Sequence, residues 1–270
     1  MSRPPVALSI AGSDPSGGAG IQADLKTFSA LGVYGTTVVT ALTAQSTRGV
    51  TGVQAVGPDF VAQQWRTLVD DVALDAIKIG MLATAELADL VGGFLDERIC
   101  EHVVLDPVMV ATSGDRLLDE DAVEAVRRLL PRASLVTPNL AEAADLLRAP
   151  VAITLDEMFA QAHALVREGA RRVLLKGGHF DDGERSVDVY VGPEGAQELS
   201  ARRVPTSNTH GTGCTLSSAL AALRPQRDTW LETAHEAKGW LTDALAAADT
   251  LQVGAGAGPV HHFHQLWRNQ

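Results

Sequence analysis

Short apolar runs alternate with amphipathic stretches along most of the chain, and this alternation constrains the fold more than any other feature of the sequence. The runs have the length of single strands, and the stretches between them repeat apolar residues with the period of an α-helix. Such alternation is typical of a mostly parallel, doubly wound sheet that is covered by helices on both faces. We expect strands at residues 6–11, 35–42, 76–80, 102–106, 134–138 and 172–176, and helices over residues 21–32, 58–71, 84–97, 119–130 and 155–169.

Two later segments, residues 186–192 and 196–204, alternate apolar and polar residues and are separated by a glycine-containing turn. This pattern predicts a small antiparallel hairpin at one edge of the sheet. No low-complexity linker and no internal repeat divides the 270-residue chain. We therefore expect one domain over residues 1–270, long enough to bury a sizeable core without disulfides.

Charge and cysteine content exclude several classes of partner. The 22 basic and 33 acidic side chains give a net charge of −11, which argues against binding to nucleic acid or to an anionic membrane surface. Two cysteines, Cys100 and Cys214, cannot build a disulfide framework. The first apolar run, residues 6–11, is too short for a secretory signal or a membrane span. These features predict a cytoplasmic protein whose phosphate-binding site, if it has one, is local.

The stretch "NTHGTGCTLSSALAAL", residues 208–223, combines an anion-binding motif with a cysteine. Its Gly211, Thr212 and Gly213 open a predicted helix, where crowded backbone N–H groups bind phosphate well. Lys176 ends a predicted strand and is a second phosphate-binding candidate. The spacing of His210 and Cys214 is also compatible with a hydrolase nucleophile and its base, but the anion-binding interpretation accounts for more of the segment.

A glycine-rich loop, "GSDPSGGAGIQAD", follows the first predicted strand. It is neither a P-loop nor a dinucleotide-binding motif, so it serves either as a turn that needs positive φ or as a close approach to a ligand. Asp24, one turn into the next helix, either faces the crevice or supports the helix N-terminus. Ligands bind beyond the carboxyl ends of strands in folds of this class, and the loop lies at such an end.

Acidic residues at other strand ends suggest a magnesium site. Asp106 ends a strand, and Asn139 and Glu142 stand three residues apart at a helix start, as in a capping box. Glu142 also suits a hydrated Mg²⁺, which takes few protein ligands. The "HHFH" of residues 261–264 has metal-binding side chains, but a position near the chain end is more often incidental.

Eight blocks in this order resemble one family, that of the hydroxymethylpyrimidine/phosphomethylpyrimidine kinases of thiamine biosynthesis. Pyridoxal kinases of the same ribokinase-like superfamily share part of the pattern. The long first block and the cysteine of "GTGCT" are more similar to the pyrimidine kinases. The blocks are "AGSDPSGGAGIQADLKTFSALG", "TALTAQSTRGV", "KIGML", "LDPVM", "TPNLAEAADLL", "LLKGGH", "NTHGTGCTLSSALAA" and "GPVHHFH".

The resemblance implies a ribokinase-like three-layer α/β/α domain, usually a homodimer, that uses ATP and Mg²⁺ at one site. It implies phosphorylation of 4-amino-5-hydroxymethyl-2-methylpyrimidine to a monophosphate and then to a diphosphate. The alternatives are a pyridoxal-type kinase that makes only a monophosphate and a catalytically idle pyrimidine-binding protein. By the same resemblance, the pyrimidine contacts are Gly12, Asp24, Gln45, Met81 and Val108; the anion hole is Gly211, Thr212, Gly213 and Cys214; the phosphate, nucleotide and Mg²⁺ residues are Lys176, Asn139, Lys238, Glu142 and Asp106.

Cys214 stands where many members of the superfamily have an aspartate base. A helix N-terminus lowers the pKa of a thiol from about 8.5, so we expect Cys214 to act as base in the first transfer. A phosphate monoester has a second pKa near 6 and needs little help from a base, so we expect Cys214 to be nearly dispensable in the second transfer. The alternative is that Cys214 is a small apolar packing residue.

Overall fold

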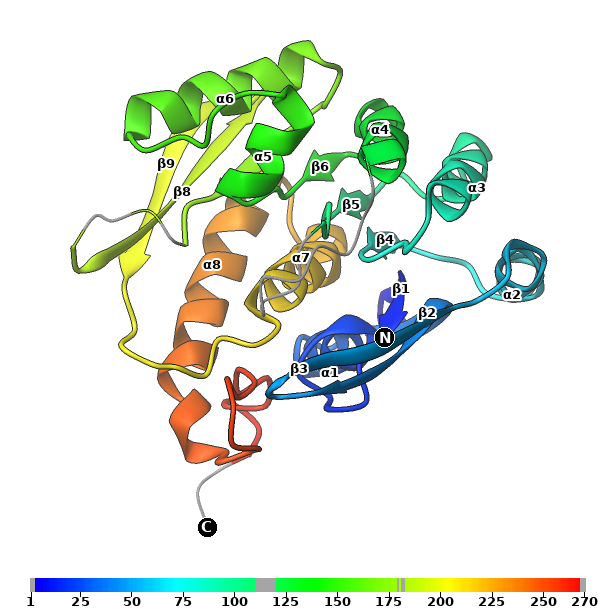
Figure 1. The fold of residues 1–270 in the computed structure, drawn as a ribbon, viewed down its shortest axis with the longest axis horizontal. Helices are drawn as coiled ribbons and strands as arrows, with labels where there is room; N and C mark the ends of the chain where they lie inside the picture. The colour runs from blue at the N-terminus through cyan, green and yellow to red at the C-terminus, as the bar shows by residue number, and fades with distance from the viewer. Residues whose placement is uncertain (1–2, 110–119, 179, 181–182, 268–270) are drawn as a thin grey trace.

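The structure is a computed structural model that describes residues 3–109, 120–178, 180 and 183–267. Nine strands form one sheet in the order β3-β2-β1-β4-β5-β6-β7-β8-β9 (Figure 1). The strands from β2 to β7 in this order are parallel, whereas β3 at one edge and β8 and β9 at the other are antiparallel to their neighbours. The strands are β1 (Val6–Ser13), β2 (Tyr34–Ser46), β3 (Gly49–Ala55), β4 (Ala76–Ile79), β5 (Val103–Leu105), β6 (Leu135–Val136), β7 (Val173–Lys176), β8 (Arg185–Gly192) and β9 (Gly195–Arg202).

Helices cover both faces of this sheet. Five of them belong to one layer with an apolar cluster around Trp65 and Ile77, and three pack with a second cluster around Phe28 and Leu220. The predicted three-layer α/β/α arrangement is therefore confirmed. The first layer has α2 (Pro58–Val69), α3 (Ala85–Asp96), α4 (Glu120–Leu129), α5 (Leu140–Leu147) and α6 (Leu155–Arg167); the second has α1 (Gly20–Ala30), α7 (Thr212–Leu223) and α8 (Trp230–Ala246).

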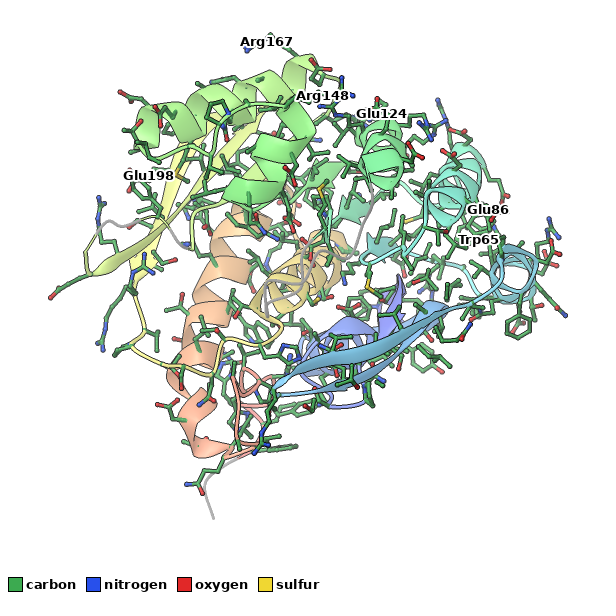
Figure 2. All side chains as sticks on the ribbon, in the orientation of Figure 1. Trp65, Glu86, Glu124, Arg148, Arg167 and Glu198 are labelled. Carbon is green, nitrogen blue, oxygen red and sulfur yellow. The ribbon has the colours of Figure 1, made fainter. Side chains whose placement is uncertain are left out.

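Side chains along the central strands point alternately to the two faces of the sheet, so each strand contributes to both apolar clusters. Leu8 and Ile10 on β1 face the first cluster, while Ala7 faces the second. Trp65 of α2 stacks on Phe94 of α3 with ring centroids 4.6 Å apart (Figure 2). Because both faces of these strands are buried, the strands read as continuous apolar runs, and this explains why they could be predicted.

The second antiparallel edge was not predicted. The expected hairpin of β8 and β9 is confirmed, but β3 pairs with β2 at the opposite edge. Its sequence "GVTGVQA" has two glycines and is largely exposed, so it lacks the burial pattern that identifies a strand. The predicted helix over residues 119–130 begins at Glu120 in the structure, and Asp119 lies outside the described residues. None of the helices in the described part of the chain has the length and apolar character that a membrane span requires.

One charged pair lies inside the second layer. Lys78 of β4 is fully buried, and its ammonium group donates to both carboxylate oxygens of Asp24 at 2.9 Å. Ser9 and Ser218 donate to the same carboxylate at 2.5 Å and 2.6 Å. The hydrogen bonds of Asp24 therefore go to β1, β4 and α7, which ties three elements of the sheet and the second layer together.

Replacing Lys78 with Met is expected to destabilise the fold by about 3–5 kcal/mol, because it leaves a buried carboxylate without its counter-ion. Urea unfolding at pH 7 measures the free-energy change. Arg128→Met is the control, since it breaks an ion pair with Asp89 in which both side chains are about half exposed, and it should cost less than about 1 kcal/mol. Equal losses in the two variants would contradict this account of the Lys78 pair.

Candidate active site

A cavity of about 870 Å³ opens at the carboxyl ends of the parallel strands. It lies where the chain order reverses, since β1 is followed by β2 on one side while β4 pairs with it on the other. Loops that follow β1, β4, β5, β6 and β7 all contribute to its lining, together with the start of α7 and one face of α8. A cleft of this size at a topological switch point is the usual ligand site of an open α/β sheet.

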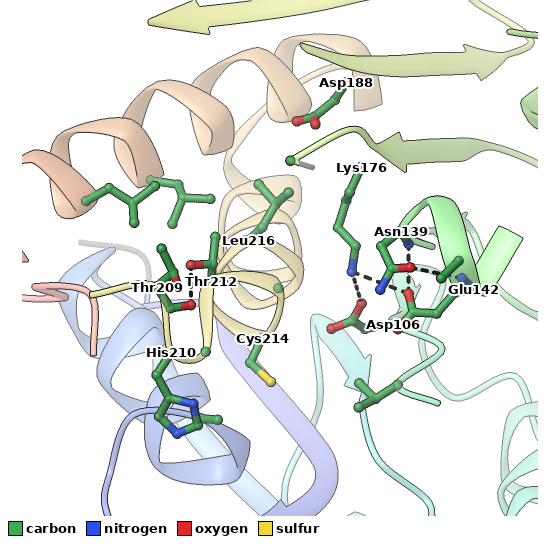
Figure 3. Close-up of a pocket in the computed structure, with 18 of the residues that line it drawn as sticks. Asp106, Asn139, Glu142, Lys176, Asp188, Thr209, His210, Thr212, Cys214 and Leu216 are labelled. Carbon is green, nitrogen blue, oxygen red and sulfur yellow. Dashed lines mark hydrogen bonds and ion pairs between the residues drawn. The ribbon is translucent and has the colours of Figure 1, made fainter. Parts of the chain in front are cut away.

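The start of α7 forms the floor of the anion site (Figure 3). Gly211 caps the helix with a φ of 73°, a left-handed conformation that glycine adopts without strain. The first N–H groups of a helix have no acceptor within it and point outward along its axis. A Cβ atom at Gly213 would lie 3.3 Å from the Lys176 ammonium, so this charge stands directly beside the helix start. Backbone N–H groups and a fixed cation therefore converge on one point.

Lys176 is held by two carboxylates. Its Nζ atom lies 2.7 Å from Asp106 Oδ1 and 3.8 Å from Glu142 Oε2. Burial would raise the pKa of Asp106, but the ammonium groups of Lys176 and Lys78 lower it, and Thr137 and Ser217 donate to the same carboxylate. Asp106 is therefore ionised, and the cation and anion are fixed relative to α7.

Asn139 and Glu142 form the capping box that their spacing predicts. The Asn139 side chain accepts from Glu142 N at 2.9 Å, and Glu142 Oε2 accepts from Asn139 N at 2.7 Å. Burial raises the pKa of Glu142 to about 7, with Asp106 adding to the rise and Lys176 opposing it. The two acidic side chains thus reach the same ammonium group from different elements, Asp106 from the end of β5 and Glu142 from the first turn of α5.

The lining of the cavity includes four of the five residues that the resemblance assigns to the pyrimidine. Gly12, Gln45, Met81 and Val108 all line it. A Cβ atom at Gly12 would lie 2.6 Å from the terminal carbon of Met81, so the absence of a side chain there makes room for Met81. Asp24 is the exception. It is fully buried behind the cavity wall, and Lys78, Ser9 and Ser218 occupy its oxygens, so neither expectation for Asp24 describes its actual contacts.

Cys214 lines the cavity at the first turn of α7, but its ionisation differs from the expectation. Burial raises the pKa of the thiol to about 11, although the Lys78 ammonium and the Gly20 N–H act in the opposite direction. The prediction of a lowered pKa was wrong because it counted the local helix terminus and not the surrounding protein. Cys214 is therefore a neutral thiol at pH 7.

Lys238 of α8 also lines the cavity, and its Nζ atom lies 2.7 Å from Oδ2 of Asp188 on β8. Asp188 accepts in addition from Gly177 N at 2.9 Å, directly after Lys176. The partner of Lys238 was not predicted, because Asp188 lies on an alternating strand where a polar residue is ordinary.

Sequence reasoning also missed Asp14 and treated His210 only as a partner of Cys214. In the structure the His210 Nε2 atom lies 2.8 Å from Asp14 Oδ2, and both residues line the cavity. The aspartate in the glycine-rich loop was the one sequence signal for this pair, but its partner, His210, lies 196 positions away in the sequence.

The C-terminal segment forms hydrogen bonds with the turn before α7 and with its first turn. His210 N donates to Gly258 O at 3.0 Å, and His262 Nε2 lies 3.0 Å from Thr215 Oγ1 in the first turn of the helix. Within the described residues, no group of three or more His, Cys, Asp or Glu side chains is arranged to hold a metal ion. Two of the three histidines of "HHFH", His261 and His262, are buried in the fold.

Comparison with known proteins gives consistent relatives. A family model for phosphomethylpyrimidine kinase matches residues 14–261. The chain is 59% identical to the hydroxymethylpyrimidine/phosphomethylpyrimidine kinase of Salmonella typhimurium over 97% of this chain and 98% of that protein. The pyridoxal kinase of Staphylococcus aureus, solved with AMP-PCP and pyridoxal, has a TM-score of 0.89 and 32% identity over 98% of this chain and 96% of that one. A phosphomethylpyrimidine kinase from Clostridium difficile has a TM-score of 0.79 and 36% identity over 89% of this chain and 99% of that one.

His262 is expected to make stability fall as the pH drops below about 6.5. Burial, with smaller contributions from Lys26 and two other histidines, lowers its pKa to about 3, so the unfolded chain binds a proton that the folded chain refuses. As the pH falls from about 6.5 to about 3, the free energy of unfolding of wild type should decrease by about 1 kcal/mol per pH unit more than that of His262→Gln. Urea unfolding at pH 7.5, 6 and 5 measures this difference. The exposed His163, changed to Gln, is the control, and a wild-type slope in His262→Gln would refute the prediction.

Proposed function

The chain belongs to the phosphomethylpyrimidine kinase family, and from this membership we propose that its cavity carries out two successive phosphoryl transfers from ATP. The first acceptor is the alcohol of 4-amino-5-hydroxymethyl-2-methylpyrimidine, and the second is the resulting monophosphate. The chain is thus a phosphotransferase of thiamine synthesis, with both kinase activities at one site.

One observation supports this function above the others: the Lys176 ammonium stands beside the N-terminus of α7, in the same cavity as four of the residues that resemblance assigns to the pyrimidine. Phosphoryl transfer needs mostly positioning and neutralisation of charge. The N–H groups of Gly213 and Cys214 and the Lys176 ammonium would hold the phosphoryl group, while Met81 and Val108 form an apolar wall for the ring. The acceptor oxygen then lies between Cys214 and the anion site.

We assign a magnesium ion to Asp106 and Glu142 on the chemistry of the donor set. Mg²⁺ binds through one or two carboxylates and fills its other positions with water and phosphate oxygens, so two carboxylates suffice. When bound, the ion neutralises phosphate charge. Of the chain's own residues, Asn139 fixes Glu142 by the capping box, and Lys176 keeps the two carboxylates together when no ion is present.

We propose that Cys214 accepts the alcohol proton during the first transfer. A neutral thiol already carries its proton, so only the thiolate, about one Cys214 in ten thousand at pH 7 for a pKa of about 11, can accept the alcohol proton as the phosphoryl group is transferred. The monophosphate is already largely deprotonated and needs no such acceptor. This assigns Cys214 to one of the two reactions.

The domain organisation, the oligomeric state, the location in the cell and the role of Lys238 stay predictions. We propose that residues 1–270 act as one kinase domain, that the protein forms a homodimer in the cytoplasm, and that Lys238 lies on the nucleotide side of the cavity. Solved pyridoxal kinases have TM-scores of 0.88–0.90 with this fold, so a pyridoxal-type kinase that makes only the monophosphate is the second candidate. A catalytically idle binding protein is disfavoured by the complete anion site.

Incubation with ATP, Mg²⁺ and hydroxymethylpyrimidine is expected to give the monophosphate and then the diphosphate, resolved by mass. Pyridoxal is tested in parallel. Lys176→Met should reduce both transfers by about 100-fold or more, because it removes a fixed positive charge from the phosphoryl site. If only a monophosphate forms and pyridoxal reacts equally well, the second candidate replaces the first; if wild type consumes no ATP with either substrate, the idle alternative holds.

Cys214→Ala is expected to slow the first transfer by about 10- to 100-fold and the second by less than about threefold. Each step is measured separately, with the alcohol and with the purified monophosphate as substrates. Cys100→Ala is the matched control, since Cys100 lies away from the cavity and its thiol donates to the His102 carbonyl. Equal losses for the two substrates would make Cys214 a packing residue.

A further inference from the structure

Asp14 lies where the glycine-rich loop after β1 meets the turn before α7. Its side chain is almost completely buried, and its carboxylate accepts four hydrogen bonds. Oδ1 accepts from Ser16 N at 2.8 Å, and Oδ2 accepts from Ser16 Oγ at 2.9 Å, from Ala19 N at 2.8 Å and from His210 Nε2 at 2.8 Å. Three of these bonds shape the loop itself, while the fourth joins the loop to the phosphate-binding turn.

All four partners of Asp14 are donors, so only a carboxylate satisfies them. Burial would raise the pKa of Asp14, but the hydrogen bonds from His210, Ser16 and Ala19 lower it, and the side chain is ionised. A carboxamide of the same shape would turn an N–H group toward at least one of these donors. Because Asp14 can only accept, the Nε2 atom of His210 carries a hydrogen.

This hydrogen fixes the direction of the Gln45 amide. As placed, the Gln45 Nε2 atom lies 3.4 Å from His210 Nε2, which sets two N–H groups against each other; a half-turn of the amide puts the carbonyl oxygen there, where it shares the hydrogen that His210 donates to Asp14. Oxygen and nitrogen of an amide exchange places by a half-turn. The Gln45 nitrogen then faces Thr43 Oγ1 at 3.1 Å, and Thr43 in turn donates to Ser13 O at 2.9 Å. In this series of hydrogen bonds every donor has an acceptor, and the second N–H of the Gln45 amide is left for a ligand.

The two loops also touch through their backbones. A Cβ atom at Gly211 would collide with the Gly18 carbonyl, and one at Gly18 would collide with the His210 ring. These contacts prevent a closer approach, and the Asp14–His210 bond prevents separation, so together they fix the distance between the glycine-rich loop after β1 (the pyrimidine loop) and the turn before α7 (the phosphate turn). The residues on both sides of this contact line the same cavity.

We propose that Asp14 and His210 are positioning residues that lock the pyrimidine loop to the phosphate turn and direct an N–H of Gln45 at a ring nitrogen of the substrate. This rests on the proposed function, since a ring nitrogen that accepts a hydrogen bond is a property of the aminopyrimidine. Neither residue touches the reacting atoms. Their effect is on substrate binding, and it reaches the substrate through Gln45.

The first test compares Asp14→Asn with Asp75→Asn in the full-length protein. Asp75 is a matched control, because it also accepts from a backbone N–H and from a side-chain N–H, that of Arg3, but at the amino end of the sheet. Asp14→Asn should raise the KM for hydroxymethylpyrimidine by tenfold or more and change the KM for ATP by less than twofold. Asp75→Asn should keep both values. A pyrimidine KM within twofold of the control, or equal rises for both substrates, overturns the proposal.

Two variants at the partner position separate positioning from folding. His210→Gln keeps a side-chain N–H at a similar reach and should retain a pyrimidine KM within about threefold of wild type, whereas His210→Leu should match Asp14→Asn. The double variant Asp14→Asn/His210→Leu should be no worse than either single variant, because both remove the same bond. Additive losses in the double variant overturn the proposal, and so does failure of Gln to rescue.

Gln45→Glu tests the direction of the amide. It exchanges the N–H donor for an acceptor of the same shape, so the pyrimidine KM should rise by tenfold or more; an unchanged KM would show that Gln45 accepts from the substrate and refute the assigned direction. Failure of the proposed function is distinguishable, because wild type and Asp75→Asn would then phosphorylate no pyrimidine. If they do phosphorylate it and Asp14→Asn matches them, only the positioning role fails.

Discussion

The parallel alignment of six strands is the constraint on which the site depends. Parallel strands present their carboxyl ends at one edge of the sheet, so Asp14, Met81, Asp106, Asn139 and Lys176 meet there although they are distant in the chain. The start of α7 faces the same edge and adds its N–H groups. The fold therefore delivers charge and hydrogen-bond donors to one cavity before any ligand is present.

Buried charges around α7 are balanced in pairs. Lys78 is paired with Asp24, Lys176 with Asp106 and Lys238 with Asp188. None of these ammonium groups is a spare positive charge, so phosphate binding must either loosen a pair or draw on the helix N-terminus and an added cation. The raised pKa of Glu142 fits this balance, since a further buried carboxylate without its own cation favours the neutral form.

The features that could be predicted from the sequence are those determined by residues close together in the chain. Buried strands, the capping box of Asn139 and the glycine-capped start of α7 are all set by neighbouring residues. The rest depends on distant partners: Asp24 was misplaced because Lys78 lies 54 positions away, although a lysine inside an apolar strand signals a missing counter-ion. The thiol pKa at Cys214 followed tertiary burial and not the helix terminus. Strand β3 escaped prediction because an exposed edge strand has no apolar pattern to reveal it.

The neutral thiol suits a site that must accept two different nucleophiles. An ionised aspartate at position 214 would attract the proton of an alcohol, but it would also face the charged monophosphate in the second transfer. Two like charges about 4 Å apart repel by about 4 kcal/mol at an effective dielectric of about 20. A thiol with a pKa of about 11 adds no such charge at pH 7, while the small fraction that is ionised is the proton acceptor proposed for the first transfer. Cysteine at the root of α7 is thus only rarely ionised and available as a base in the first reaction, and it leaves the second reaction unhindered.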